Sequence, residues 1–310
     1  MTKILITGVA GNIGSALAGA LLRSPQYEII GIDNFLTGSR DRVPPISDRF
    51  RFIKADVNNY RDICSIFYKN SFDYVFHFAA VVGVERTLQN GLLVLNDIES
   101  IKHILHLSSV CSVKRVFYSS SSEVYGEPVS LPQHEYDTPL NSRLPYAIVK
   151  NVCEAFCRSY YQEHGLKYTI LRFFNTYGPG QSCDFVIPRF VKASLDGEPI
   201  YIHGDGSQTR TFCYVSDNVD TMINLLESGS YVNEIINIGS SEEVSILELA
   251  RKVIKITNST SRIEFLPPLK EGDMSRRLPS IDRMMSVLQR PLLSLEDGLR
   301  LLVSFQEQRR

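Results

Sequence analysis

The chain has 310 residues, 44% of them hydrophobic and 22% charged, which is typical of a soluble globular protein. The formal net charge is −1 and no segment is rich in lysine or arginine, so neither nucleic acid nor an anionic membrane surface is an expected partner. The length suits one large α/β domain or two closely packed subdomains.

The amino terminus, "MTKILITG", is a short apolar run that meets glycine at once. It lacks the length of a signal peptide, and no part of the chain approaches the roughly 18 consecutive apolar residues of a membrane span. We therefore expect a cytoplasmic protein without membrane contact. The six cysteines are scattered and include no CxxC pair, so we expect reduced packing residues, and the sequence indicates no metal site.

Apolar segments of strand length alternate with amphipathic segments of helix length over the first 174 residues. Strands are expected at residues 3–7, 27–33, 51–54, 74–78, 116–119 and 168–174. Helices are expected at residues 13–23, 60–69, 91–109 and 145–164. Strands that are apolar on both faces and alternate with helices predict an α/β fold, with a doubly wound parallel sheet covered by helices on both sides.

The pattern changes after about residue 174. Loops rich in Gly, Pro and Asp appear, such as "NTYGPGQSCD" and "HGDGSQTR", and shorter elements separate them. The sequence therefore predicts a first domain over residues 1–174, to which the chain partly returns around residues 210–240. A smaller portion over residues 175–310 is expected to bind mainly the substrate.

Three glycines, Gly8, Gly11 and Gly14, stand between the first expected strand and the first expected helix. Glycine lets the backbone turn sharply and approach a pyrophosphate, whose charge is stabilised by the amide groups at the helix amino terminus. The second expected strand ends in Asp33, whose carboxylate can accept a hydrogen bond from a ribose 2′-hydroxyl and would repel a 2′-phosphate. The sequence thus predicts a Rossmann-type domain that binds NAD rather than NADP.

The GxxGxxG spacing resembles that of the extended short-chain dehydrogenases/reductases. The resemblance continues in the segments "KADV" and "HFAA", at the ends of the third and fourth expected strands. It implies further cofactor contacts at Asn12, Ile13, Asp56, Val57, Ala79 and Ala80.

The segment "PYAIVK" places Tyr146 and Lys150 at positions i and i+4 near the start of an expected helix. Side chains at this spacing project from one face of a helix. An ammonium group beside a phenol stabilises the phenolate and lowers the tyrosine pKa from about 10 toward the working pH. Such a phenolate can accept a proton from a sugar hydroxyl while a hydride passes to a nicotinamide. We therefore expect Tyr146 to be the catalytic base, and Lys150 to tune it and contact the cofactor.

The stretch "YSSSSEVYG" joins an apolar run to consecutive serines and a glutamate. Ligands of open α/β sheets bind beyond the carboxyl ends of the strands, where small hydroxyl groups can hydrogen-bond a substrate without blocking it. Ser120 and Ser122 fit a role in capping the next helix. In the extended family's pattern, Ser121 corresponds to the Ser/Thr that works beside the catalytic tyrosine, and Ser119 to a residue on the cofactor side.

Beyond these motifs, the resemblance to the nucleotide-sugar epimerase/dehydratase family covers nearly the whole chain, including "LRFFNTYGP", "VIPRF", "GDGSQTRTFCYVSDNV" and "KEGDMSRR". It implies a nucleotide-diphosphate sugar as the substrate, with a UDP-sugar favoured, and a homodimer packed through helices near residues 91–109 and 145–164. Arginine suits the diphosphate because its planar guanidinium can meet two phosphate oxygens. The implied substrate contacts are Ser121, Ser122, Asn175, Arg210, Lys270 and Arg276, with Arg277 as the alternative to Arg276.

Members of this family share a first step, the oxidation of the sugar at C4 by bound NAD, and differ in the later steps. Ser121, Tyr146 and Lys150 are sufficient for a 4-epimerase, which is the function that we expect. Glu123 is the discordant residue, because epimerases of the family often have a neutral side chain there. A Glu123 that reaches the sugar could act as a base at C5, which would instead indicate a 4,6- or 5,6-dehydratase or a C5 epimerisation.

Three other functions stay open. UDP-glucuronate decarboxylases share the Ser-Glu-Val-Tyr-Gly pattern, but they typically have an arginine where this chain has Gly180, and the loss of a fixed cation beside a carboxylate is not a conservative change. An enzyme that stops at the ketone would be a net C4 oxidase. A non-catalytic NAD-sensing protein on the same fold would not need Ser121, Tyr146 and Lys150 together.

Overall fold

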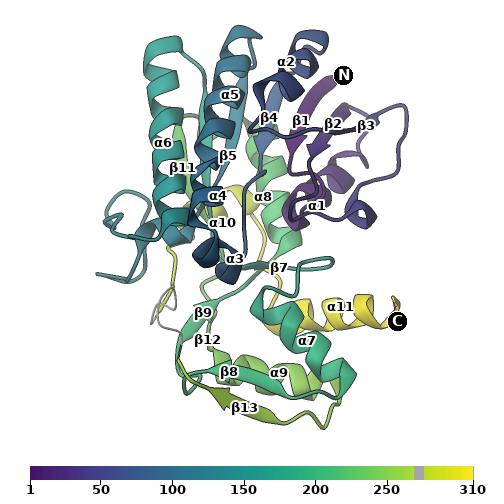
Figure 1. Ribbon diagram of the computed structural model, residues 1–310, viewed down its shortest axis with the longest axis vertical. Helices are drawn as coiled ribbons and strands as arrows, with labels where there is room; N and C mark the ends of the chain where they lie inside the picture. The colour runs from purple at the N-terminus through teal and green to yellow at the C-terminus, as the bar shows by residue number, and fades with distance from the viewer. Residues whose placement is uncertain (269–275, 310) are drawn as a thin grey trace.

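The computed structural model describes residues 1–268 and 276–309. Its larger part is built on a seven-stranded sheet with the strand order β11-β6-β5-β4-β1-β2-β3, in which all neighbouring strands are parallel. The strands are β1 (Thr2–Thr7), β2 (Tyr27–Asp33), β3 (Phe50–Lys54), β4 (Tyr74–His77), β5 (Arg115–Ser121), β6 (Tyr168–Phe173) and β11 (Glu234–Ile238). Figure 1 shows this sheet in the upper part of the molecule and a smaller part below it.

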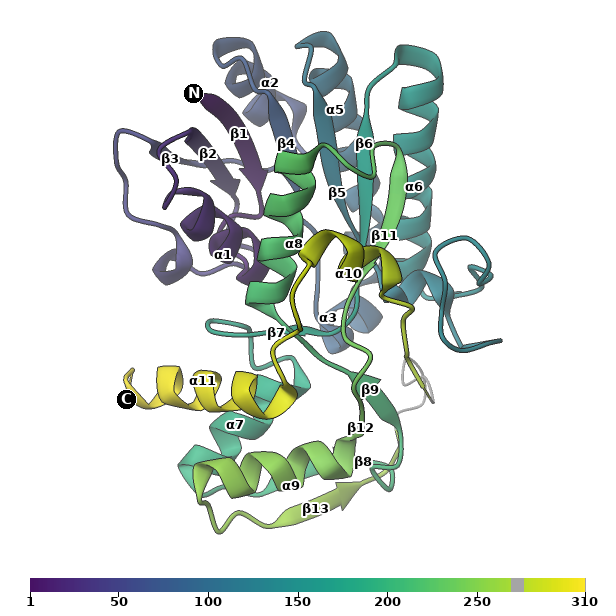
Figure 2. The same ribbon diagram turned by 180° about the vertical axis from the view of Figure 1, so that it is seen from behind.

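Helices cover both faces of the sheet. On one face lie α2 (Tyr60–Lys69), α5 (Asp97–Val110) and α6 (Pro145–His164), which Figure 1 shows in front. On the other face lie α1 (Asn12–Leu21) and α8 (Val215–Ser228), which Figure 2 shows in front. The predicted doubly wound parallel sheet is therefore confirmed.

Each face of the sheet has its own hydrophobic core, because successive residues of a strand point to opposite faces. Ile4 and Ile6 of β1 pack in one cluster with Leu17 of α1, and Leu5 packs in the other with Ile104 of α5. All five side chains are fully buried, and each such burial stabilises the fold by about 1.5–3 kcal/mol. The two cores hold the strand ends, and the loops that follow them, in fixed places.

The smaller part consists of short strand pairs and three helices. β8 (Ile200–His203) pairs with β13 (Ile263–Leu266), and β9 (Thr209–Thr211) pairs with β12 (Glu243–Ser245). The helices are α7 (Val186–Asp196), α9 (Ile246–Thr257) and α11 (Leu295–Glu307). β7 (Thr176–Tyr177) and β10 (Cys213–Tyr214) pair where the chain leaves the larger part and returns to it.

Three expectations about the elements need correction. The seventh strand, β11, was not expected, and together with α8 it returns the chain to the sheet beside β6. The helix expected at residues 91–109 is two helices, α4 (Gly91–Leu95) and α5, and α3 (Val84–Gln89) precedes them. β5 extends to Ser121 because its last residues pair with β6.

The remaining short elements are η1 (Arg40–Arg42), η2 (Ser122–Tyr125) and α10 (Asp282–Leu288). α10 packs against β11 and α8, as Figure 2 shows. Within the described ranges, no helix has both the length and the apolar character needed to cross a membrane.

Candidate active site

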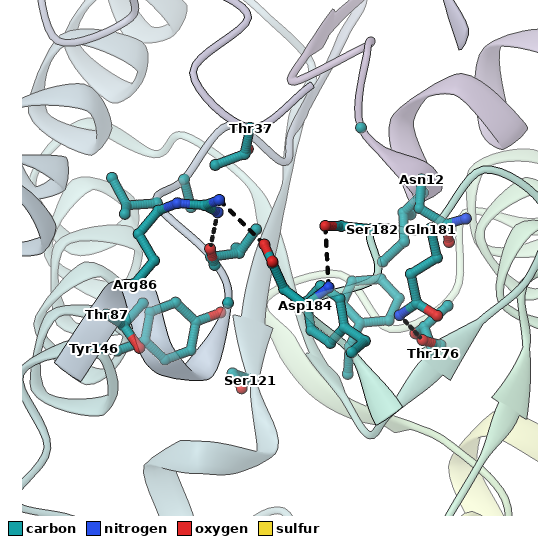
Figure 3. Close-up of a pocket in the computed structure, with 18 of the residues that line it drawn as sticks. Asn12, Thr37, Arg86, Thr87, Ser121, Tyr146, Thr176, Gln181, Ser182 and Asp184 are labelled. Carbon is teal, nitrogen blue, oxygen red and sulfur yellow. Dashed lines mark hydrogen bonds and ion pairs between the residues drawn. The ribbon is translucent and has the colours of Figure 1, made fainter. Parts of the chain in front are cut away.

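A cavity of about 920 Å³ lies between the carboxyl ends of the strands and the smaller part of the molecule. The loops that follow β1 to β4 and the end of β5 form one side, and residues of α7 and β8 form the other. Figure 3 shows Tyr146 and Ser121 at this cavity, with Asn12 and Gln181 farther along it. The volume lies within the roughly 300–1,000 Å³ of sites for cofactors and small molecules.

The glycine loop leaves no room for side chains at two positions. Gly8 has a φ of +70°, and a Cβ there would lie 2.7 Å from the amide nitrogen of Ala79. A Cβ on Gly14, in the first turn of α1, would collide with the carbonyl oxygen of Gly8. Gly11 closes the turn by donating its N–H to that same carbonyl at 3.0 Å. The loop therefore packs directly against the helix amino terminus, where unpaired amide groups favour an anion.

Asp33 supports this loop from the end of β2. Its Oδ2 accepts a hydrogen bond from the amide of Ala10 at 3.0 Å, and its Oδ1 accepts one from the amide of Phe35 at 2.7 Å. Burial raises the pKa of this carboxyl, and the two amide bonds oppose that shift. A carboxylate has about four acceptor sites, so the group can hold the loop and still accept a ribose hydroxyl.

Of the other expected cofactor residues, Lys150 does not line the cavity, Tyr146 does, and the remaining ones also line it. They are Asn12, Ile13, Asp56, Val57, Ala79, Ala80 and Ser119. Asn12 donates through Nδ2 to the carbonyl oxygen of Pro179 at 2.9 Å and so links the glycine loop to the opposite side of the cavity. With its glycine turn, helix amino terminus and acidic strand end, this side of the cavity fits a dinucleotide.

The first half of the serine stretch fixes the end of β5 to α6. The backbone carbonyl of Ser119 accepts a hydrogen bond from Nζ of Lys150 at 2.7 Å. The hydroxyl of Ser120 donates to Oε1 of Glu154 at 2.6 Å, and Glu154 forms a buried ion pair with Arg172 at 2.7 Å. The stretch from Ser119 to Ser122, called the shelf below, is thus bonded to the helix that carries Tyr146 and Lys150.

Ser121 and Ser122 form the part of the shelf that turns into η2. Oγ of Ser121 accepts a hydrogen bond from the amide of Glu123 at 3.2 Å and caps η2. The capping role expected of Ser120 and Ser122 was therefore wrong, because β5 continues to Ser121 and η2 begins at the next residue. Ser121 lines the same cavity as Tyr146, and its hydroxyl lowers the pKa of the Tyr146 phenol.

Tyr146 and Lys150 lie one turn apart in α6, with Nζ of Lys150 5.6 Å from the centre of the Tyr146 ring. Burial raises the pKa of the Tyr146 phenol, the charge of Glu123 raises it further, and the hydroxyl of Ser121 lowers it. Burial lowers the pKa of Lys150. The expected fall in the phenol pKa is not found in this structure, because the loss of solvation outweighs the neighbouring cation.

Glu123 and Arg277 form an ion pair inside the cavity. Oε1 of Glu123 lies 2.7 Å from Nη2 of Arg277, and the side chains are only 16% and 7% exposed. Oε2 of Glu123 is buried and has no hydrogen-bond partner among the described residues. The two charges act on Tyr146 in opposite directions, since Glu123 raises the phenol pKa and Arg277 lowers it. Glu123 is therefore held beside the phenol as part of a pair.

Two of the expected substrate contacts from the smaller part, Asn175 and Arg210, line the cavity. Asn175 has a φ of +29° and donates through Nδ2 to the carbonyl oxygen of Thr211 at 2.9 Å. Arg210 is buried and donates through Nη1 to the carbonyl oxygen of Thr209 at 2.8 Å. Both residues are held by β9, so their positions at the cavity are fixed by backbone contacts.

The expected contact at Arg276 needs correction. Its side chain is half exposed and pairs with Glu243 at 2.7 Å, outside the residues that line the cavity. The adjacent Arg277 faces the cavity instead. Lys270 lies outside the described residues.

Three further arginines line the cavity: Arg189, from the segment "VIPRF", and Arg42 and Arg86, which lie outside the quoted motifs. Arg42 packs against Gly180, where a Cβ would lie 3.2 Å from its Nε. Arg42, from the loop after β2, therefore lies beside Gly180, the position at which UDP-glucuronate decarboxylases typically have an arginine. Arg86 pairs with Asp184 at 3.1 Å, and Figure 3 shows the two side chains pointing toward each other. The described residues include no group of His, Cys, Asp or Glu that could hold a metal ion.

Comparison with known proteins gives one consistent result. The family described as "NAD dependent epimerase/dehydratase family" matches residues 4–239. Over 96% of this chain and 95% of the relative, the sequence is 34% identical to UDP-N-acetyl-alpha-D-glucosaminuronate decarboxylase of Bacillus cytotoxicus. The structure is similar to that of UDP-glucose 4-epimerase from Thermotoga maritima with UDP-glucose (TM-score 0.93, 30% identity, 99% of both chains covered). It is also similar to UDP-glucuronic acid 4-epimerase from Bacillus cereus with UDP-glucuronic acid and NAD (TM-score 0.91, 31% identity, 100% of both chains).

Proposed function

The chain belongs to the NAD-dependent epimerase/dehydratase family and is therefore an NAD-dependent enzyme, and on that premise we propose that it is a 4-epimerase of nucleotide-diphosphate sugars. The observation that carries the proposal is that Ser121 and Tyr146 line the wall of one cavity, with Lys150 one helical turn away from Tyr146. UDP-sugars are the proposed substrates, because the similar proteins named above carry UDP-sugars in their names.

The proposed cofactor site is the side of the cavity formed by the glycine loop. Gly8, Gly11 and Gly14 would allow the pyrophosphate to approach the amino terminus of α1, and Asp33 would accept a ribose hydroxyl. NAD supplies the hydride acceptor for oxidation at C4 of the sugar. The protein's task is to place the sugar and to move one proton.

In the proposed mechanism, Tyr146 takes the proton of the C4 hydroxyl and Ser121 shares a hydrogen bond with the same oxygen. Lys150, held by the carbonyl of Ser119 at 2.7 Å, stabilises the phenolate. The 4-keto sugar then turns within the cavity, and Tyr146 returns the proton while the hydrogen at C4 returns to the opposite face.

A second candidate, the decarboxylation of a nucleotide-linked uronate, is favoured by Arg277. This buried guanidinium lies beside Tyr146, where a sugar carboxylate could replace Glu123 as its partner. Oxidation at C4 would make such a sugar a β-keto acid, which loses carbon dioxide readily. Arg42, which packs against Gly180, could supply the positive charge that decarboxylases typically have at that position. A dehydratase is less well supported, because the ion pair restrains the carboxylate that would act as the base.

Incubation of the purified enzyme and NAD with a panel of UDP-, GDP-, CDP- and dTDP-sugars tests the proposal. The panel should include the uronates, and products should be identified by mass spectrometry and NMR. We expect a new C4 stereoisomer of unchanged mass from at least one UDP-sugar. Tyr146→Phe should lose activity by about 10²–10⁴-fold and still bind NAD.

Each of the other possible products would indicate a different reaction. Loss of carbon dioxide would replace the 4-epimerase by the decarboxylase, loss of water would indicate a dehydratase, and loss of two hydrogens would indicate a net oxidase. Full activity in Tyr146→Phe would contradict the proposed base. No reaction with any sugar, together with unimpaired NAD binding, would favour a non-catalytic NAD-sensing protein.

A further inference from the structure

A second, much smaller cavity lies beneath Tyr146. Its volume is about 10 Å³, which is at the lower limit of the space that one water molecule needs. Most of the side chains around it are polar: His77, Asp97, Ser100, Tyr118, Tyr146, Lys150 and Cys153. Asp97 lines both this cavity and the large one, yet the proposed mechanism gives this buried carboxyl no task.

The side chains of Lys150 and Asp97 face the small cavity with much of their hydrogen-bonding capacity unused. Lys150 is 4% exposed, and its Nζ donates to the carbonyl of Ser119 at 2.7 Å. Asp97 is 7% exposed, and its Oδ2 accepts from the amide of Val81 at 2.7 Å. An ammonium group has three donors and a carboxylate about four acceptor sites. Within the described part of the chain, no direct ion pair joins the two, so each could use a bridging water.

We propose that one ordered water in the small cavity bridges Asp97 and Lys150, and that ionised Asp97 is the counter-charge that keeps the buried Lys150 protonated. The inference rests on the proposed roles of Tyr146 and Lys150. Removing a charge from water costs several kcal/mol unless it is paired, and a bridging water is nearly as good as a direct hydrogen bond. Asp97 is thus a positioning residue that acts on Tyr146 through the electric field of the Asp97–Lys150 pair.

The other ionisable groups at the small cavity are neutral. Burial lowers the pKa of His77 to about 3, and its Nδ1 is hydrogen-bonded to the hydroxyl of Thr7 at 2.7 Å. Burial raises the pKa of the Tyr118 phenol and of the Cys153 thiol. Asp97 is therefore the anion that this cavity offers to Lys150.

Charges from the surrounding elements do not replace it. Glu154 faces Lys150 from α6, but it is paired with Arg172 at 2.7 Å. Burial raises the pKa of Asp97, the amide of Val81 and the charge of Lys150 lower it, and the charge of Asp56, in the loop after β3, adds to the rise. Glu123 and Arg277 act on Tyr146 from the far side of the phenol as an ion pair.

The sign of the effect follows from the direction of each interaction. Burial lowers the pKa of Lys150, and the charge of Asp97 raises it. Burial also raises the pKa of Tyr146, and Asp97 adds to that rise. Removing the charge of Asp97 should therefore lower the pKa of both groups, whereas a purely structural role of Asp97 would shift neither.

The test is an NMR titration of the NAD-free enzyme labelled with ¹³C in its lysine and tyrosine side chains. Lys150→Arg and Tyr146→Phe assign the two signals. Asp97→Asn should titrate both groups at lower pH than the wild type. The matched control, Glu99→Gln, changes an exposed residue of the same helix and should leave both unchanged. No substrate is needed, so the result is independent of whether the protein is an epimerase.

Unchanged titrations of Lys150 and Tyr146 in a folded Asp97→Asn variant would overturn the proposal. If this variant does not fold, ¹³C-labelled aspartate in the wild type decides the matter, because the proposal requires Asp97 to be ionised at neutral pH and a protonated Asp97 overturns it. A crystal structure that resolves ordered water checks the bridge. A direct Asp97–Lys150 contact or a dry cavity would overturn that part.

Discussion

Charges of both signs affect the pKa of Tyr146. Burial raises the pKa of its phenol most, the charges of Glu123 and Asp97 raise it further, and Ser121 and Arg277 lower it. A base must be deprotonated to act, so the rate should rise with pH through the pKa of this group. A change that lowers the pKa moves the acidic limb of the pH profile to lower pH, and a change that raises it moves the limb to higher pH.

Two substitutions should therefore move the acidic limb in opposite directions. Ser121→Ala removes a hydroxyl that lowers the phenol pKa, so the limb should move to higher pH. Glu123→Gln removes a charge that raises the pKa, so the limb should move to lower pH. The measurement is kcat/KM against pH, which reports the free enzyme. Glu127→Gln, an exposed residue nearby, is the control, and shifts of equal sign in the first two variants would contradict the assignment of Tyr146.

Neighbouring residues in the sequence show what a motif leaves undecided. The motifs pointed to Tyr146 and Ser121, and the fold brings their side chains together. They could not separate Arg276 from Arg277, because adjacent side chains of an extended segment point to opposite sides and only packing decides which one is buried. The discordant Glu123 was visible in the sequence, but its partner comes from a segment more than 150 residues away, which no local pattern indicates.

At the scale of elements, the bounds of strands with a continuous apolar pattern were predicted well, whereas the polar ends of strands were not. β2 and the helices α2 and α6 have the expected bounds. β5 was expected to end at Ser119, since serines are uncommon in strands, but pairing with β6 extends it to Ser121. β11 was missed because it has only five residues, both apolar and polar, in a loop-rich region. Such a short segment does not indicate a strand by itself, and it becomes one by pairing with the edge of the sheet at β6.

The glycines of α1 allow a matched test of the cofactor site. Gly14→Ala would place a Cβ against the carbonyl of Gly8, whereas Gly19→Ala, in the same helix, would meet no atom within 4 Å. The first should displace the glycine loop and abolish detectable NAD binding in calorimetry. The second should keep NAD binding and raise stability by roughly 0.5–1 kcal/mol in denaturant unfolding, since alanine is the better helix former. Equal NAD affinity in the two variants would argue against this loop as the pyrophosphate site.

At the scale of the whole molecule, a buried polar network connects the shelf to the segment that carries Arg277. Arg172, paired with Glu154, donates to the hydroxyl of Tyr125 at 3.0 Å, and that hydroxyl donates to Oδ1 of Asn237 at 2.7 Å. Asn237 donates in turn to the carbonyl of Gln133 at 2.9 Å. The amide of Gln133 bonds the carbonyl of residue 278, and its carbonyl accepts from the amide of residue 280. The place of Arg277 thus depends on contacts made by α6, β6, η2, β11 and the loop that contains Gln133.

The proposed homodimer belongs to the same scale. α4 packs against α6, and Figure 1 shows α6 beside α5 on the outer face of the sheet. Exposed apolar side chains gather on α3, α4 and α6: Leu88, Leu92, Leu93, Leu95 and Ile148. Leu92 is 82% exposed, which is unfavourable for a leucine that meets no partner. A second copy of the chain, packed helix against helix, would remove this surface from water.

We expect Leu92→Glu combined with Ile148→Glu to convert a dimer into a monomer in size-exclusion chromatography with light scattering. A stable dimer would bury about 1,200–2,000 Å² in total, and two carboxylates at its centre would lose their solvation without a partner. Leu301→Glu, at a residue 51% exposed on α11, lies in the smaller part and should stay dimeric. A wild type that is already monomeric at micromolar concentration would contradict the dimer, whereas a variant that remains dimeric would place the interface on another face. The variant should also keep NAD affinity, because none of the cofactor residues proposed above comes from the exposed leucines.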